Sequence, residues 1–118
     1  RGVEATIYVN DLGVIVGGPD AGQTYAGVLN GTDGDDVMVG TANADEIHGE
    51  EGRDMICARA GDDTVYGGDG KDTIYGGRGA DELRGQRGSD AIFGNRGPDE
   101  IHGGRGRDVQ LLHSFYLL

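Results

Sequence analysis

The chain has little of several features that would define other protein classes. It has a single cysteine, Cys57, which excludes an intrachain disulfide. No apolar run approaches the roughly 18 residues that a membrane-spanning helix needs. The sequence contains no HExxH or GxSxG motif and no paired catalytic carboxylates, so it predicts no enzyme. Basic residues are few, and the formal net charge of −11 argues against nucleic-acid binding.

Aspartate, in contrast, recurs every nine residues without interruption. In this frame residues 31–111 form nine tandem copies, of which residues 67–75, GGDGKDTIY, are the clearest. Glycine occupies position one except at Ala58, and position four except at Asn43. Position eight is apolar in every copy but the last, where Gln110 stands. The position-six aspartates are Asp36, Asp45, Asp54, Asp63, Asp72, Asp81, Asp90, Asp99 and Asp108.

This fixed period predicts a repeat fold rather than a disordered acidic linker, because a linker has no reason to place an apolar residue two after each aspartate. Strand side chains alternate between faces, so position eight should point inward and positions seven and nine outward. Glycines at positions one and four should allow positive φ, and Asn43 is the best substitute there. Two copies should complete one coil, with odd and even copies in separate parallel sheets.

The copies resemble the RTX nonapeptide family, whose pattern is G-G-x-G-x-D-x-U-x with U apolar. The resemblance covers residues 31–111. It implies an all-β fold, a right-handed parallel β-roll (a β-solenoid) that binds calcium. It also implies a secreted, extracellular bacterial protein, since members of this family are typically exported into calcium-rich surroundings.

Calcium sites are expected between stacked turns, where position-six carboxylates eighteen residues apart would face each other. The resemblance implies that each ion is held by two aspartates and by backbone carbonyls. Oxygen ligands alone favour a hard cation, and calcium takes about six to eight of them, whereas magnesium needs a tighter octahedron. The small apolar core does not offset the entropy of ordering the chain, so calcium should supply folding free energy. The sequence allows up to seven ions, between Asp36/Asp54, Asp45/Asp63, Asp54/Asp72, Asp63/Asp81, Asp72/Asp90, Asp81/Asp99 and Asp90/Asp108.

The segments outside the repeat are expected to cap the roll, because a solenoid needs covered ends. The apolar runs at 5–9 and 14–16 predict a β-hairpin around residues 10–13. Residues 1–30 are therefore interpreted as an N-terminal hairpin cap, residues 31–111 as the roll and the apolar residues 112–118 as a C-terminal cap.

The outward positions predict different surfaces for the two sheets. Even copies carry polar pairs such as Glu82 and Arg84, whereas odd copies carry a mostly apolar row. Such a row indicates an interface or a covered surface, so we expect a homodimer through it. The alternative is coverage by the hairpin or by the tail. The apolar row consists of Val37, Val39, Met55, Cys57, Tyr75, Phe93 and Leu111.

The function that the sequence favours is a non-enzymatic calcium-binding module that folds on binding calcium. It would stabilise, target or provide adhesion to an extracellular bacterial protein. One alternative is an ice-binding β-solenoid, although position two shows threonine only at Thr32 and Thr41 rather than a regular ladder. The other is the C-terminal RTX segment of a secreted hydrolase whose catalytic domain is absent.

Overall fold

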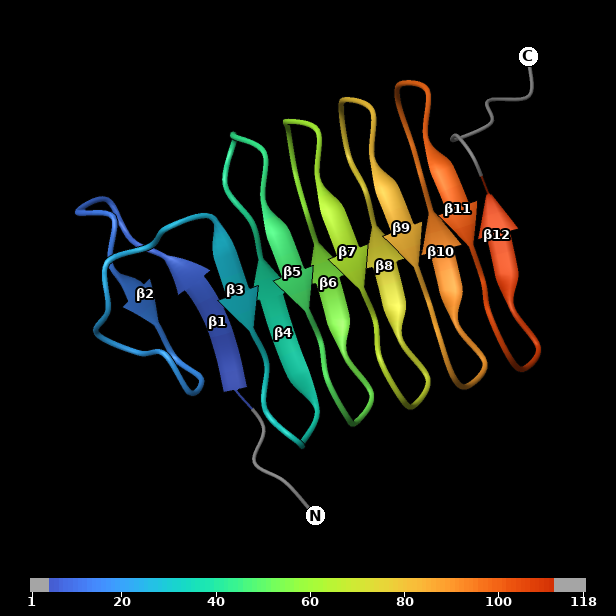
Figure 1. Ribbon diagram of the computed structural model, residues 1–118, viewed down its shortest axis with the longest axis horizontal. Coiled ribbons are helices and arrows are strands. Elements are labelled where there is room, and N and C mark those ends of the chain that lie inside the picture. Colours follow the sequence, from blue (N-terminus) through green and yellow to red (C-terminus); the bar gives the residue numbers. More distant parts are fainter. Residues whose placement is uncertain (1–4, 112–118) are drawn as a thin grey trace.

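The computed structural model describes residues 5–111, which form strands and turns and contain no helix (Figure 1). Within these residues, therefore, no helix is long and apolar enough to cross a membrane. The strands are β1 (Ala5–Val9), β2 (Ile15–Val16), β3 (Val28–Asn30), β4 (Asp36–Val39), β5 (Glu46–His48), β6 (Met55–Cys57), β7 (Thr64–Tyr66), β8 (Thr73–Tyr75), β9 (Glu82–Arg84), β10 (Ala91–Phe93), β11 (Glu100–His102) and β12 (Val109–Leu111).

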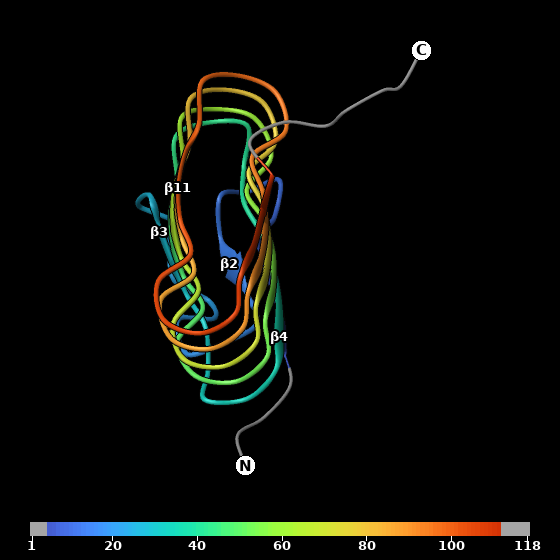
Figure 2. The same cartoon turned by 90° about the vertical axis from the view of Figure 1, so that its right-hand side faces the viewer.

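The strands form two sheets, and the chain passes from one to the other after each nine-residue copy. The seven-stranded sheet has the order β12-β10-β8-β6-β4-β1-β2, and the five-stranded sheet has the order β11-β9-β7-β5-β3. Residues eighteen apart are register partners in parallel strands, as in Met38↔Ile56 and Ile47↔Val65. Figure 2, which looks along the stack, shows the coils one behind another as flattened rings. The predicted all-β solenoid, with odd and even copies in separate sheets, is confirmed.

The core is a pair of ladders built from position eight. Because the register is eighteen residues, each inward side chain stacks on the equivalent side chain of the next coil. Ile101 is only partly buried, and Gln110 in the last copy is exposed. The position-eight residues with no exposed surface are Met38, Ile47, Ile56, Val65, Ile74, Leu83 and Ile92.

The predicted hairpin forms, but it also extends the roll. β1 and β2 pair antiparallel through Tyr8↔Val16 and Val9↔Ile15. The side chain of Asn10 holds the turn by accepting hydrogen bonds from the N–H groups of Leu12 and Val14, at 2.9 and 3.0 Å. The other edge of β1 pairs in parallel with β4, so β1 is a further rung of the seven-stranded sheet rather than only a cap.

A further rung, β3, was not anticipated from the sequence. It pairs in parallel with β5, and Leu29 is fully buried at the place that Ile47 takes one coil later. Leu29 lies nine residues before Met38, so the apolar period continues upstream of the aspartates, while Gly27 stands where the aspartate would be. The two sheets therefore begin before residue 31. The tail at 112–118 lies outside the described residues, and its capping role stays a prediction.

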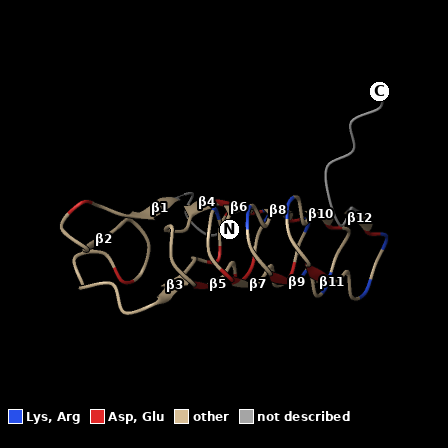
Figure 3. Ribbon diagram, turned by 90° about the horizontal axis from the view of Figure 1, so that it is seen from above, with Lys and Arg blue, Asp and Glu red and all other residues tan. Residues whose placement is uncertain are grey.

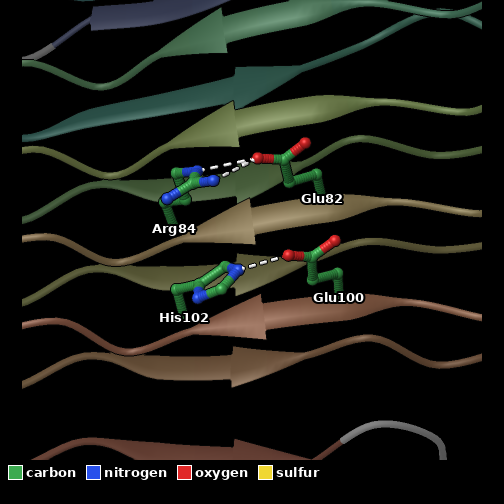
Figure 4. Close-up of polar contacts among 4 residues, drawn as sticks. All are labelled: Glu82, Arg84, Glu100 and His102. Atoms are coloured by element: carbon green, nitrogen blue, oxygen red, sulfur yellow. Dashed lines mark hydrogen bonds and ion pairs between the residues drawn. The ribbon is translucent and has the colours of Figure 1, made fainter.

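The outer faces of the two sheets differ in polarity. Figure 3, a ribbon coloured by residue type, shows acidic residues on strands of the five-stranded sheet and basic residues in turns toward the β12 end. On the five-stranded sheet, acidic residues pair with neighbours two positions along the same strand, as in Glu82–Arg84 and Glu100–His102, both at 2.6 Å (Figure 4). This face is the polar, solvent-exposed surface that the sequence predicted for the even copies. The face of the seven-stranded sheet is more apolar, with Val37, Met55 and Tyr75 exposed.

Candidate metal centre

The position-six aspartates lie in two rows that follow the turns, and a hydrogen bond joins each aspartate to the next in its row. The backbone N–H of Asp54, for example, donates to Oδ1 of Asp72 at 2.9 Å. The carboxylate therefore accepts a backbone hydrogen bond from the preceding coil and links the two coils, a role that the sequence did not suggest. The same bond, at 2.8–2.9 Å, joins all seven pairs proposed from the sequence: Asp36/Asp54, Asp45/Asp63, Asp54/Asp72, Asp63/Asp81, Asp72/Asp90, Asp81/Asp99 and Asp90/Asp108.

In most of these carboxylates Oδ1 accepts the hydrogen bond between coils, whereas Oδ2 takes no part in it. These side chains are almost wholly buried; Asp72, for example, exposes 1 % of its surface. A buried carboxylate oxygen without a donor is costly, which indicates that something else satisfies it. The Oδ2 atoms that are buried and accept no hydrogen bond from the described residues belong to Asp54, Asp63, Asp72, Asp81 and Asp90.

The electrostatics of the rows agree with this geometry. Burial raises the pKa of Asp72 to about 9, and repulsion from Asp54 and Asp90 adds to the effect, against a lowering by the hydrogen bond from Asp54. Burial likewise raises the pKa of Asp63 to about 8, that of Asp54 and Asp81 to about 7, and that of Asp90 to about 6. Rows of buried carboxylates therefore need protons or cations at neutral pH.

Position-one glycine makes room for the carboxylate, and its role differs from the one the sequence suggested. None of the position-one glycines 31, 40, 49, 67, 76, 85 and 103 has a positive φ. A Cβ added at Gly49 would instead lie 2.7 Å from Asp54 Oδ2 and 2.6 Å from the carbonyl oxygen of Gly67 in the next coil. The missing side chain thus leaves a small space lined by a carboxylate oxygen and a carbonyl oxygen.

Positive φ occurs instead at positions two and four. Position four adopts it from Gly52 (97°) to Gly106 (107°), but the prediction for Asn43 was wrong, because this residue does not enter the left-handed region. Position two was not expected to need it. The position-two residues with positive φ are Glu50, Arg59, Gly68, Gly77, Gln86, Asn95 and Gly104.

The first two turns have a different conformation, and three residues that the sequence analysis did not assign to the site explain it. Thr32 and Thr41, at position two, lack the positive φ and donate hydrogen bonds to the aspartates of their own turns. Tyr25 donates its hydroxyl to Asp45 Oδ1 from outside the repeat. A β-branched residue disfavours positive φ, so threonine at position two was the available signal for the turns. Nothing in the sequence pointed to Tyr25.

The donor set fits a hard cation. Among the described residues no three His, Cys, Asp or Glu side chains cluster around a common point. An ion beside Asp54 Oδ2 would therefore take further ligands from backbone carbonyls, such as the neighbouring carbonyl of Gly67. A ligand set made only of carboxylate and carbonyl oxygen suits calcium better than zinc or copper. The Asp carboxylates would hold the ion, and the ion would neutralise their buried charge.

Comparison with known proteins identifies the repeat. A model of the RTX calcium-binding nonapeptide repeat matches the chain four times, at residues 22–56, 30–65, 58–83 and 84–109. No curated protein and no solved structure matches the chain. The four matches cover most of the sequence and include residues 22–30, where Leu29 forms the additional rung. The chain therefore belongs to the RTX calcium-binding nonapeptide repeat family.

Proposed function

We propose that this chain is a non-enzymatic calcium-binding module whose folding depends on calcium. Its role is to stabilise, target or provide adhesion to an extracellular bacterial protein. The observation that carries the proposal is the set of buried Oδ2 atoms, on Asp54, Asp63, Asp72, Asp81 and Asp90, that accept no hydrogen bond from the described residues. A fold that buries such oxygens is destabilised until a cation binds them, so binding free energy becomes folding free energy.

The export of the protein would then control its folding. Calcium is abundant outside cells, and the affinity of extracellular calcium modules is typically about 10⁻⁴–10⁻³ M. A chain of this kind stays unfolded where calcium is scarce and folds where it is plentiful. The family resemblance supports this location.

A calcium titration tests the proposal. We expect the full chain in excess chelator to lack a sheet spectrum in circular dichroism and to gain it with calcium, but much less with magnesium. A sheet spectrum of full amplitude in chelator would refute calcium-dependent folding. Thermal hysteresis of the folded protein would instead favour an ice-binding solenoid, and a hydrolase reading would require a catalytic domain beyond these residues.

We also propose that the outer face of the seven-stranded sheet is the interface of a homodimer. Tyr75 and Phe93 stack with ring centroids 5.2 Å apart, and Val37, Met55 and Tyr75 are 37–45 % exposed. The hairpin is not a candidate to cover this face, since β1 and β2 continue the sheet beyond β4 instead of lying across it. The mass of the calcium-folded protein by light scattering tests the dimer.

A further inference from the structure

One row of aspartates begins with Asp36, in an odd copy, and the other with Asp45, in an even copy. In the first turn of the odd row, hydrogen bonds from the same turn satisfy the Asp36 carboxylate without a metal. The N–H of Thr32 donates to Asp36 Oδ2 at 2.8 Å, and the Thr32 hydroxyl donates to Asp36 Oδ1 at 2.8 Å. Both carboxylate oxygens therefore have a donor from the same residue. Asp36 is 2 % exposed, so these hydrogen bonds satisfy a buried group.

The first turn of the even row does the same. The N–H and hydroxyl of Thr41 donate to Asp45 Oδ2 and Oδ1 at 2.7 and 2.8 Å. Tyr25 adds a third donor to Asp45 Oδ1. The two rows therefore start with the same arrangement of donors, although Asp36 begins β4 of the seven-stranded sheet and Asp45 directly precedes β5 of the five-stranded sheet.

The following turns lack this arrangement. Glu50 and Arg59, which replace threonine at position two, adopt φ of 73° and 72°, and the Oδ2 atoms of Asp54 and Asp63 accept no hydrogen bond from the described residues. Threonine would be strained in that left-handed region, because its β-branch clashes with the backbone. The residue type at position two thus separates two kinds of turn. In closed turns threonine donates to both oxygens of the aspartate, and in open turns Oδ2 is left without a donor among the described residues.

We propose that Thr32 and Thr41 take the place of the cation in the first two turns, so that the metal rows begin at Asp54 and Asp63. This assignment rests on the proposed calcium binding. To hold an ion, Asp36 or Asp45 would have to give up hydrogen bonds that already satisfy both of its oxygens, which makes these turns poor sites. Removing the pairs Asp36/Asp54 and Asp45/Asp63 from the seven leaves five ion positions.

The structure also gives a reason for this arrangement at the N-terminal end. In the coil before these turns, the register partner of Asp36 is Ala5 in β1, and Gly27 stands eighteen residues before Asp45, so neither row has a position-six carboxylate there. An ion there would lack an aspartate from the preceding coil. Threonine donors therefore satisfy the first aspartate at the N-terminal end of each row, where no earlier aspartate is available as a metal ligand.

Diffraction from the unmutated protein tests the assignment directly. We expect crystals of the full chain grown in calcium to show anomalous calcium peaks beside the carboxylates of Asp54 and Asp63 and none beside those of Asp36 and Asp45. A calcium peak bonded to the Asp36 or Asp45 carboxylate would overturn the assignment. The absence of calcium peaks from the whole chain would refute the proposed calcium binding itself.

Ion counting on variants gives a second readout. Native mass spectrometry of the calcium-loaded Asp36→Asn/Asp45→Asn variant should give the same number of ions as the unmutated chain. The matched Asp54→Asn/Asp63→Asn variant should lose about two ions, because both substitutions remove open sites. Conversely, Thr32→Gly/Thr41→Gly should gain up to about two ions, because glycine permits the open turn. A loss of ions from Asp36→Asn/Asp45→Asn with its sheet spectrum intact would overturn the assignment.

Discussion

The backbone N–H of Asp54 donates to the carboxylate of Asp72, eighteen residues further along the chain, at 2.9 Å. This bond ties one coil to the next at the place where a metal would also bind. Its equivalents follow both rows of turns to Asp108. The position-six carboxylate is therefore both a link between coils and a candidate ligand, and the mutational expectations below depend on separating these two roles.

Asp72→Ala should destabilise the protein more than Asp36→Ala. Asp72 accepts the N–H of Asp54 and keeps an Oδ2 without a donor, whereas no aspartate N–H donates to Asp36 among the described residues and Thr32 satisfies its oxygens. Leaving a buried N–H without an acceptor costs about 1–3 kcal/mol, before any loss of bound calcium. Thermal unfolding and calcium titration of both variants measure the difference. Equal effects would contradict the stacked arrangement.

Ala58→Gly should raise calcium affinity. Ala58 is the only non-glycine at position one and is fully buried, so by equivalence with Gly49 its methyl group should occupy the space that glycine leaves beside the carboxylate in the other turns. Removing the methyl group should open the site at Asp63 and lower the calcium concentration at the midpoint of folding.

The reverse change, Gly49→Ala, serves as the matched control. Its Cβ would lie 2.7 Å from Asp54 Oδ2, so we expect weaker calcium binding and a loss of about 1–3 kcal/mol from overpacking. If Ala58→Gly left the midpoint unchanged while Gly49→Ala raised it, the methyl group of Ala58 would not limit its site.

The metal-free roll should be stabilised by acid. The folded-state pKa values of Asp90, Asp54 and Asp72 are about 6, 7 and 9, all above the unfolded value of 3.8, because burial disfavours the charged form. A raised pKa contributes stability that is complete below the unfolded pKa and is lost as pH rises through the folded one. In the absence of calcium, sheet content by circular dichroism should therefore fall as the pH rises from about 4, near the unfolded pKa, to about 9, the highest of these folded pKa values. Constant or rising sheet content over that range would count against carboxylate burial.

Tyr75→Asp combined with Phe93→Asp should convert the calcium-folded protein to a monomer. The two rings stack on the outer face of the seven-stranded sheet, where two buried charges would be strongly unfavourable at an interface. Light scattering reports the mass. Thr64→Asp with Tyr66→Asp, on the five-stranded sheet, is the matched control and should leave the mass unchanged.

The proposed dimer has a clear alternative in the tail. If the unmutated protein is monomeric in calcium and Cys57 is shielded from thiol reagents, residues 112–118 cover the face instead. The dimer proposal would then be wrong.

Much of the fold follows from one period. The nine-residue recurrence of aspartate and of the apolar residue two positions later is sufficient to predict two parallel sheets, the buried ladder from Met38 to Ile92 and the pairing of aspartates eighteen residues apart. A repeat makes this possible because each coil meets only its neighbours, so local pattern and long-range contact coincide. The extra rung β3 was missed because Gly27 interrupts the aspartate series, although Leu29 keeps the apolar one.

Tertiary structure alone decided how each carboxylate oxygen is used. The sequence by itself determined which residues stack, because the period sets the register of every coil on the next. It did not determine that the N–H of Asp54 would use one oxygen of Asp72, or that Thr32 would satisfy both oxygens of Asp36. Those outcomes depend on the direction of individual N–H groups, which a period of residue types does not encode.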